Sequence, residues 1–186
     1  YYVYCKLRGD KKPSGESKKA SVAALEIPDD EDHKIYIYFA SQTGTAEGFA
    51  SEISDEAQEL GLHTEVVDFE EFDPDTFMEH KNVIVVAATY GEGDPPDNAT
   101  EFANWLSKEA TPGCLGDMKF TVMGLGNRQY VHFNHFAVTV DSKLSELGAT
   151  RIYQLGQGDD DGDIEEDFAK WKDEGLLDAV LSEMMG

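Results

Sequence analysis

Residues 41–46, SQTGTA, combine hydroxyl side chains with a glycine directly after an apolar run and contain no basic residue. A strand that leads through such a loop into a helix offers backbone N–H groups, the hydroxyls of Ser41, Thr43 and Thr45, and the positive end of the helix dipole. These donors can hold a phosphate without a cation. The loop lacks the lysine of GxxxxGK[ST] and the spacing of GxGxxG, so it predicts binding of a single terminal phosphate monoester.

Two further loops help to distinguish this phosphate loop from a Ser/Thr-rich turn that merely caps a helix. Loops 89–98, TYGEGDPPDN, and 124–134, GLGNRQYVHFN, each carry a tyrosine near a glycine. A flat ring between these loops would lie between Tyr90 and Tyr130, with offset stacking that contributes roughly 0.5 to 1.5 kcal/mol for each face. A single tyrosine is more often core, but two tyrosines beside a phosphate loop favour a ligand.

The loops follow segments whose patterns predict alternating strands and helices. Apolar runs predict five strands, at 35–40, 63–69, 82–89, 119–126 and 151–158. Apolar residues at three- and four-residue spacing predict helices at 45–60, 98–109, 135–147 and 164–182. The runs at 35–40 and 83–88 are apolar almost throughout, as strands buried on both faces of a parallel sheet must be. The sequence therefore predicts a doubly wound α/β domain that binds ligands beyond the carboxyl ends of its strands.

Composition and charge limit the possible classes of function. The chain has 186 residues, 40% of them hydrophobic, which is enough for one globular domain with a core. Its formal net charge is -23, so contact with nucleic acid or anionic lipid is disfavoured and a basic partner is expected. The only cysteines, Cys5 and Cys114, give no disulfide framework. The histidines have no metal-ligand spacing with cysteine, so no metal site is expected.

The first 33 residues differ in composition from the rest. Residues 9–33 are rich in charge, Ser, Gly and Pro, which predicts that 1–33 are a tail and linker before a domain at 34–183. Residues 1–12, YYVYCKLRGDKK, are either a frayed tail or the cytosolic end of a membrane span, where aromatic residues are followed by basic ones. No apolar segment is long enough to cross a bilayer, so we expect this chain to be a soluble fragment of a longer protein, in which residues 1–33 are a tail or the possible end of a membrane anchor.

Four motifs together resemble one family. SQTGTAEGFA at 41–50, ATYGEGDPPDNA at 88–99, GLGNRQYVHFN at 124–134 and LGQGDDDGDIEEDFAKW at 155–171 are similar, in order and spacing, to the FMN-binding, flavodoxin-like domain of diflavin reductases. The resemblance runs from about Ile35 to Trp171. It implies a flavodoxin-like α/β fold, with a doubly wound sheet of five parallel strands in the order 2-1-3-4-5 and helices on both faces.

The resemblance also implies which residues bind the cofactor. The phosphate loop and the two tyrosine loops would hold FMN, together with Asp160 after the fifth strand. The implied FMN-binding residues are Ser41, Gln42, Thr43, Gly44, Thr45, Ala46, Ala88, Thr89, Tyr90, Gly91, Leu125, Gly126, Asn127, Arg128, Gln129, Tyr130, Val131, His132, Phe133, Asn134 and Asp160. In this family the carbonyl of the Gly91 counterpart accepts a hydrogen bond from the reduced flavin, and glycine can flip its peptide at little steric cost. No catalytic acid, base or nucleophile is expected.

Electron transfer follows from such a cofactor. FMN accepts two electrons and releases them singly, and in the resembling family it passes them from an FAD- and NADPH-binding domain, expected to be absent from this chain, to haem proteins. We expect partners such as microsomal cytochromes P-450 or cytochrome c, and a full-length protein on the cytosolic face of the endoplasmic reticulum membrane. The resemblance implies an acidic docking surface formed by Asp68, Glu70, Glu71, Asp159, Asp161, Glu165 and Glu166.

Alternatives remain open for the whole chain and for its most acidic stretch. The chain could be an independent flavodoxin, the FMN domain of another diflavin reductase, or a non-redox phosphate-binding domain of similar winding. Residues 158–168, GDDDGDIEEDF, could be a solvated loop in which Asp163 caps the last helix. A calcium loop is disfavoured, because Gln157 and Phe168 occupy the positions where an EF-hand needs Asp and Glu.

Overall fold

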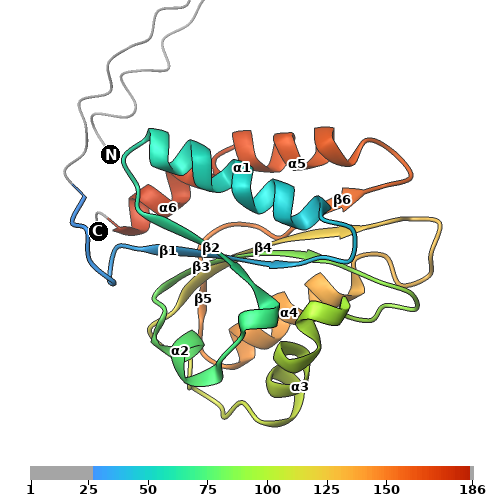
Figure 1. Cartoon of the computed structure of the whole chain (residues 1–186), viewed down its shortest axis with the longest axis horizontal. Coiled ribbons are helices and arrows are strands. Elements are labelled where there is room, and N and C mark those ends of the chain that lie inside the picture. Colours follow the sequence, from blue (N-terminus) through green and yellow to red (C-terminus); the bar gives the residue numbers. More distant parts are fainter. Residues whose placement is uncertain (1–26, 185–186) are drawn as a thin grey trace, which may run out of the picture.

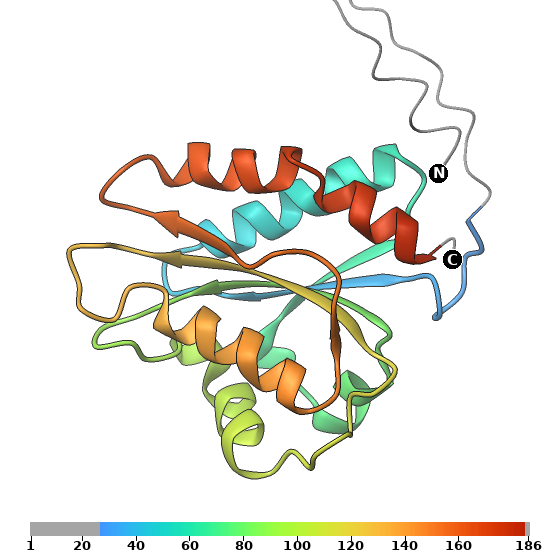
Figure 2. The same cartoon turned by 180° about the vertical axis from the view of Figure 1, so that it is seen from behind.

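A parallel sheet between two layers of helices makes up residues 27–184, the part of the chain that the computed structural model describes (Figure 1, Figure 2). Its strands are β1 (Ile35–Ala40), β2 (Thr64–Asp68), β3 (Asn82–Ala88), β4 (Lys119–Gly126), β5 (Thr150–Arg151) and β6 (Gly156–Asp159). The strand order is β2-β1-β3-β4-β5, and β6 also pairs with β4. The predicted order 2-1-3-4-5 and the flavodoxin-like α/β fold are therefore confirmed.

The helices divide between the two faces of the sheet (Figure 1). One face carries α1 (Thr45–Glu59), α5 (Ile164–Asp173) and α6 (Leu176–Met184). The other carries α2 (Pro74–Glu79), α3 (Thr100–Lys108), α4 (His135–Glu146) and the short 3-10 turns η2 (Phe69–Glu71) and η3 (Asp97–Ala99). Successive β1 side chains enter opposite cores, Ile37 on the α1 side and Tyr38 on the α3 side. Because both faces are covered, every residue of β1 is buried, as predicted for a strand inside a parallel sheet.

The fifth strand differs from the prediction, because it is two short strands instead of one. Residues 121–122 of β4 lie opposite 152–155, which leave the ladder between β5 and β6. The Tyr153 hydroxyl donates to the Trp171 carbonyl at 3.1 Å, and the Trp171 indole N–H donates to the Gln154 carbonyl at 2.7 Å. These two bonds fix the extra residues against α5, which explains the interruption.

Two helices also differ from the prediction. The segment 164–182 is not one helix, since Gly175 with φ 137° separates α5 from α6. Helix α2 was not predicted, because it has only six residues and little periodicity. Its signal was local: Asp73 accepts a hydrogen bond from the Thr76 N–H at 2.8 Å, and Pro74 occupies the first helical turn.

Gly48 lies on the exposed side of α1, where an added Cβ would meet no heavy atom within 4 Å. We expect Gly48→Ala to raise the free energy of unfolding by about 0.5–1 kcal/mol, because alanine has the higher helix propensity and restricts the unfolded chain. Urea unfolding measures the change. Gly113→Ala is the matched control, since its site is equally open but its φ of 83° strains an alanine. A Gly48→Ala protein no more stable than wild type would contradict the prediction.

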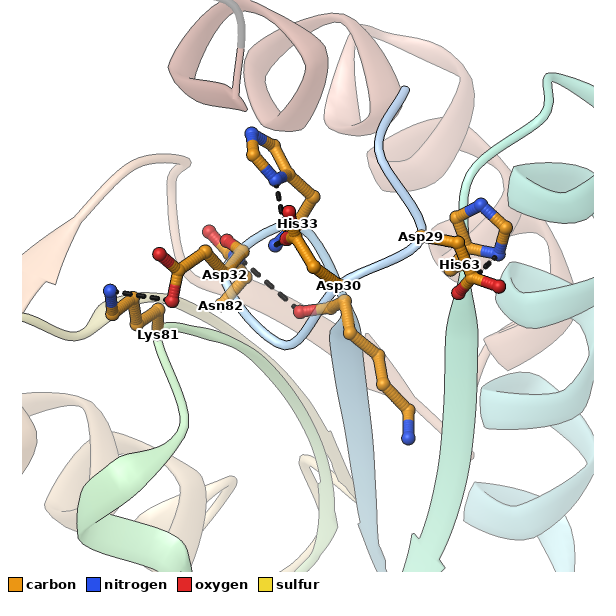
Figure 3. Close-up of polar contacts among 8 residues, drawn as sticks. Asp29, Asp30, Asp32, His33, His63, Lys81 and Asn82 are labelled. Carbon is orange, nitrogen blue, oxygen red and sulfur yellow. Dashed lines mark hydrogen bonds and ion pairs between the residues drawn. The ribbon is translucent and has the colours of Figure 1, made fainter. Parts of the chain in front are cut away.

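The described part of the predicted linker lies against the amino-terminal edge of the sheet (Figure 3). Lys81 Nζ lies 2.6 Å from Asp32 Oδ1, and His63 Nδ1 lies 3.3 Å from Asp29 Oδ1. The Asn82 side-chain amide donates to the Asp32 carbonyl at 2.9 Å. These contacts hold residues 29–32 at the edge opposite the ends of the strands where a ligand is expected.

The predicted tail of aromatic and basic residues, 1–12, lies outside the described residues. Most of the predicted linker lies outside them too, so the domain boundary at residue 34 stays a prediction. Within residues 27–184, no helix has both the length and the apolar character needed to span a membrane.

His80 is buried just after α2. Its ring stacks on that of Tyr36 with centroids 3.4 Å apart, and its Nδ1 lies 3.1 Å from the Tyr38 hydroxyl. Burial lowers the pKa of His80 from its ordinary value of about 6.5. Below that pH the unfolded chain binds a proton at this position more readily than the folded chain does. The free energy of unfolding therefore decreases as the pH is lowered.

We therefore expect His80→Gln to lose less unfolding free energy than wild type when the pH is lowered from about 7 to about 5. Urea unfolding at each pH measures the loss. The comparison with wild type is essential, because many carboxylates also titrate as the pH falls. Equal losses in the two proteins would show that His80 makes no contribution.

Candidate functional site

The carboxyl ends of β1, β3, β4 and β6 meet at one edge of the sheet, on the right in Figure 1. Backbone hydrogen bonds join the ends of β3, β4 and β6. The Thr89 N–H donates to the Leu125 carbonyl at 2.8 Å, and the Asp160 N–H donates to the Gly126 carbonyl, also at 2.8 Å. The structure thus brings together the four loops that the sequence assigned to one ligand.

The loop between β1 and α1 exposes the start of the helix. Gly44 occupies the N-cap position with φ 91°, and it has no side chain to offer to the first turn. Ser41 Oγ accepts a hydrogen bond from the Gly44 N–H at 2.8 Å and so closes the turn before the helix begins. No side chain of the loop caps α1, so the geometry does not favour the interpretation of this loop as a mere helix cap. Uncapped N–H groups and the positive end of the helix dipole suit an anion.

The same loop is tied to η3 by residues that the sequence did not single out. The Ser41 N–H donates to Asn98 Oδ1 at 3.1 Å. The Gln42 side-chain amide donates to Asp97 Oδ2 at 3.3 Å, and the Asp97 N–H donates to Gln42 Oε1 at 3.4 Å. These partners are more than fifty positions apart in the chain, so no local pattern signals them.

Tyr90 and Tyr130 are 54% and 63% exposed. Within residues 27–184, no other Tyr, Phe or Trp residue is as exposed as these two. Core residues are buried, whereas these two tyrosines are largely exposed. The interpretation of them as core residues is therefore wrong. Both side chains are accessible to a ligand, and the stacking role stays a prediction.

The turn after β3 packs against the loop after β4. The Tyr90 N–H donates to the Asp94 carbonyl at 2.9 Å, and the Asp94 N–H donates back to the Tyr90 carbonyl at 2.8 Å. Gly91 inside this turn has φ 51°, and Gly93 has φ 104°. A Cβ on Gly93 would lie 2.9 Å from the Cβ of His132, so the two loops are in close contact.

Asp159 at the end of β6 fixes the loop 127–133. Its carboxylate accepts from the Arg128 N–H at 2.9 Å and from the Asp161 N–H at 3.1 Å, and it pairs with Arg128 Nε at 3.1 Å. The Arg128 guanidinium lies 4.5 Å from the centre of the Phe133 ring. The carboxylate of Asp159 is thus engaged within the protein, and its side chain is only 15% exposed.

Asn134 follows the loop 127–133 and is the N-cap residue of α4. It is fully buried, and within residues 27–184 it alone among the non-glycine residues has a positive φ, 53°. Its side-chain amide donates to the Gly158 carbonyl at 3.2 Å, whereas its buried Oδ1 has no hydrogen-bond partner. Asn134 therefore joins the end of the loop to β6.

The comparison with known families agrees with this geometry. The sequence model of the family described as "Flavodoxin" matches residues 37–171 of this chain. The chain belongs to the flavodoxin family. Membership of this family implies that the chain binds FMN.

Known relatives specify the kind of flavodoxin domain. The NADPH–cytochrome P450 reductase of Homo sapiens is 47% identical over 145 residues, which cover 75% of this chain and 21% of the reductase. The reductase of Dictyostelium discoideum is 41% identical over 166 residues, covering 87% of this chain and 25% of the relative. The chain is thus homologous to the FMN domain of these reductases and spans about a quarter or less of their length.

Solved structures agree on the fold. The flavodoxin of Streptococcus pneumonia has a TM-score of 0.67 and 26% identity, covering 81% of this chain and 99% of that flavodoxin. A short-chain flavodoxin associated with a bacterial microcompartment has a TM-score of 0.69 and 23% identity, covering 81% of this chain and 98% of that one.

The predicted FMN-binding residues of this flavodoxin domain fall into three groups by burial. Most are exposed: Gln42, Thr43, Gly44, Thr45, Tyr90, Gly91, Arg128, Gln129, Tyr130, Val131, His132 and Asp160. Six are partly buried: Ser41, Ala88, Thr89, Gly126, Asn127 and Phe133. Three are buried, namely Ala46, Leu125 and Asn134. All of them lie in or beside the four loops at this edge.

The predicted docking residues divide in a similar way. Glu70, Glu71, Asp161, Glu165 and Glu166 are exposed, and Asp68 and Asp159 are partly buried. Asp68 Oδ1 accepts hydrogen bonds from the Glu70 N–H and from the Asn98 side-chain amide, at 2.8 and 2.7 Å. Asp163 accepts from the Glu166 N–H at 2.9 Å and caps α5, as predicted.

These residues fit FMN. A phosphate monoester needs several donors and tolerates the absence of a cation, which the loop before α1 provides. A flat tricyclic ring needs aromatic faces near solvent, which Tyr90 and Tyr130 provide. No part of the observed arrangement requires a metal, and within residues 27–184 no group of three His, Cys, Asp or Glu side chains has metal-binding geometry.

Proposed function

We propose that this chain is the FMN-dependent electron-transfer module of an NADPH–cytochrome P450 reductase, and that it passes single electrons from an FAD- and NADPH-binding domain to a haem protein. The observation that carries the proposal is the uncapped, cation-free start of α1 at the same edge of the sheet as two exposed tyrosines. The 47% identity to the human reductase supports the assignment to that type.

Each loop has its own task in this proposal. The backbone N–H groups of the loop before α1 and the hydroxyls of Thr43 and Thr45 hold the phosphate. Tyr90 and Tyr130 orient the ring and exclude water from its faces, and the Gly91 carbonyl would accept a hydrogen bond from a ring N–H of the reduced cofactor. Bound FMN supplies the conversion between two-electron and one-electron transfer. The protein therefore needs no acid, base or nucleophile.

The acidic side chains serve association with the partner. Glu165 and Glu166 are exposed on the first turn of α5, next to the loop that contains Asp160. Glu70 and Glu71 are exposed on η2, after β2. A negative surface beside the cofactor steers a basic haem protein into contact and raises the association rate more than the affinity. We propose that the full-length protein lies on the cytosolic face of the endoplasmic reticulum membrane, as the resemblance to the diflavin reductases implies.

A visible absorption spectrum of the purified protein, followed by identification of the pigment that denaturation releases, tests the proposal. We expect a flavin spectrum that dithionite bleaches, and FMN as the released pigment. A protein that carries no flavin, and that binds none when FMN is added back, would refute the proposal. A chain that binds FMN but transfers no electrons to cytochrome c when photoreduced would contradict its proposed role as an electron donor to haem proteins.

Glu166→Lys is expected to slow electron transfer from the photoreduced protein to cytochrome c by about threefold to tenfold at low ionic strength. The difference from wild type should shrink as added salt shortens the screening length to about 8 Å or less. Stopped-flow measurement at several salt concentrations gives the rates. Glu59→Lys is the matched control, because it makes the same charge change on an exposed residue at the far end of α1. Equal rates for the two variants at low salt would contradict the proposed docking surface.

A further inference from the structure

Asn98 lies where three strand-end segments meet. Its Oδ1 accepts the Ser41 N–H at 3.1 Å. Its side-chain amide donates to Asp68 Oδ1 at 2.7 Å and to the Phe39 carbonyl at 3.3 Å. One side chain thus connects the start of the phosphate loop with the ends of β1 and β2.

Only an amide fits this set of partners. Ser41 supplies a donor and needs an acceptor, whereas Asp68 and Phe39 supply acceptors and need a donor. A carboxylate at position 98 would place a second negative charge against Asp68. An alanine would leave the Ser41 N–H, the Asp68 carboxylate and the Phe39 carbonyl without this partner.

The position of Ser41 sets the rest of the loop. Ser41 Oγ accepts the Gly44 N–H at 2.8 Å, and Gly44 is the residue with φ 91° that starts α1. Asn98 therefore acts on the start of the helix through Ser41. The neighbouring bonds between Gln42 and Asp97 are longer, 3.3 and 3.4 Å, and lie on the exposed side of the loop.

We propose that Asn98 is a positioning residue for the phosphate of FMN, which it serves by holding the loop before α1 in its binding shape. The proposal rests on the proposed function, because it presumes that this loop binds the FMN phosphate. In this proposal Asn98 acts through Ser41 and not by direct contact with the cofactor. Asn98 ends the loop that carries Tyr90, but its side-chain hydrogen bonds go to Ser41, Phe39 and Asp68. We therefore expect its contribution to be larger for ligands that carry the phosphate.

The test compares FMN with riboflavin, which has the same ring and side chain but no phosphate. We expect Asn98→Ala to weaken FMN binding about tenfold or more and to change riboflavin binding by less than about threefold. Fluorescence titration of the apoprotein gives both dissociation constants. Asn104→Ala is the matched control, since this exposed asparagine on α3 contacts Lys108 on the same helix and should change neither constant.

Exchanging the side chains of Asn98 and Asp68 provides a second test, because the exchanged pair has the same net charge as the original one. Asn98→Asp alone should weaken FMN binding at least as much as Asn98→Ala, because the new carboxylate faces Asp68. Asn98→Asp combined with Asp68→Asn should recover part of the loss, because it restores the bonds from position 98 to Ser41 and to position 68 but leaves the Phe39 carbonyl without its donor. The new amide at position 68 can still accept the Glu70 N–H and donate to position 98, and the new carboxylate can still accept the Ser41 N–H. These variants carry the test if Asn98→Ala does not fold.

The outcomes separate this proposal from the proposed function. A wild-type protein that binds neither ligand overturns both. A wild-type protein that binds FMN, with an Asn98→Ala variant of unchanged FMN affinity, overturns only the role of Asn98. Equal losses for FMN and riboflavin also overturn it, because they show general disruption of the site. A selective loss for FMN with recovery in the exchanged pair supports it.

Discussion

Replacing Gly126 by alanine is expected to weaken FMN binding by roughly tenfold to a hundredfold, equivalent to about 1.4 to 2.7 kcal/mol. An added Cβ would lie 2.8 Å from the Asn134 N and 3.0 Å from its Oδ1, which is closer than non-bonded atoms normally approach. Asn134 cannot easily move away, because it is fully buried and its amide is bonded to the Gly158 carbonyl. The loop 127–133, which carries Tyr130, must therefore shift.

The dissociation constant for FMN, measured by fluorescence titration of the apoprotein, gives the effect of Gly126→Ala. Gly162→Ala is the matched control in a neighbouring strand-end loop, since its Cβ would meet only the Asp159 carbonyl at an ordinary 3.6 Å. Urea unfolding of both apoproteins separates a displaced loop from an unfolded domain. Wild-type FMN affinity in Gly126→Ala would show that the loop position does not matter for binding.

The succession of strands and helices along the chain could be predicted because buried positions must be apolar. A strand covered on both faces must be apolar at nearly every position, and the segments that became β1 and β3 show this. The break between β5 and β6 could not be predicted in the same way. It depends on Tyr153 and Gln154 bonding to Trp171, which lies on a helix that follows the strand.

The loops that we propose to bind the cofactor stood out in the sequence because their chemistry is local. A phosphate loop needs glycine and hydroxyl residues between a strand and a helix, and these stand together at 41–46. Asn98 could not be found this way, because it contacts Ser41 from 57 positions further along the chain. Only the register of the sheet brings these two residues together.

The same distinction applies to the acidic residues. The sequence gives the number of negative charges but does not show which carboxylates are hydrogen-bonded within the protein and which are exposed. Asp159 bonds two backbone N–H groups and Arg128, and Asp68 bonds Asn98 and caps η2. Glu70, Glu165 and Glu166 are exposed instead. We therefore expect charge reversal at the three glutamates to affect association, and reversal at the two aspartates to affect the folding of the cofactor loops as well.

Introducing a carboxylate into the loop before α1 is expected to have the largest effect on FMN binding. Thr43 is exposed, with its hydroxyl oxygen 3.4 Å from that of Thr45. The loop 41–46 contains no basic residue that could offset an added negative charge. Two unit charges about 6 Å apart repel by roughly 3 kcal/mol at an effective dielectric constant of about 20. Thr43→Asp should therefore weaken FMN binding about a hundredfold or more.

Thr43→Val is the matched control, because it removes the hydroxyl while keeping the shape and adding no charge, and its loss should be about tenfold or less. Titration with FMN and with riboflavin gives the dissociation constants. Thr43→Asp should bind riboflavin almost as well as wild type does, and its deficit for FMN should shrink as salt is added, since the repulsion is electrostatic. A deficit that is equal for the two ligands would mean that the loop does not bind the phosphate. A loop that holds the phosphate with backbone donors and a helix dipole alone must lose affinity for FMN when a carboxylate is added to it. That outcome would therefore contradict the proposal that this loop binds the phosphate without a cation.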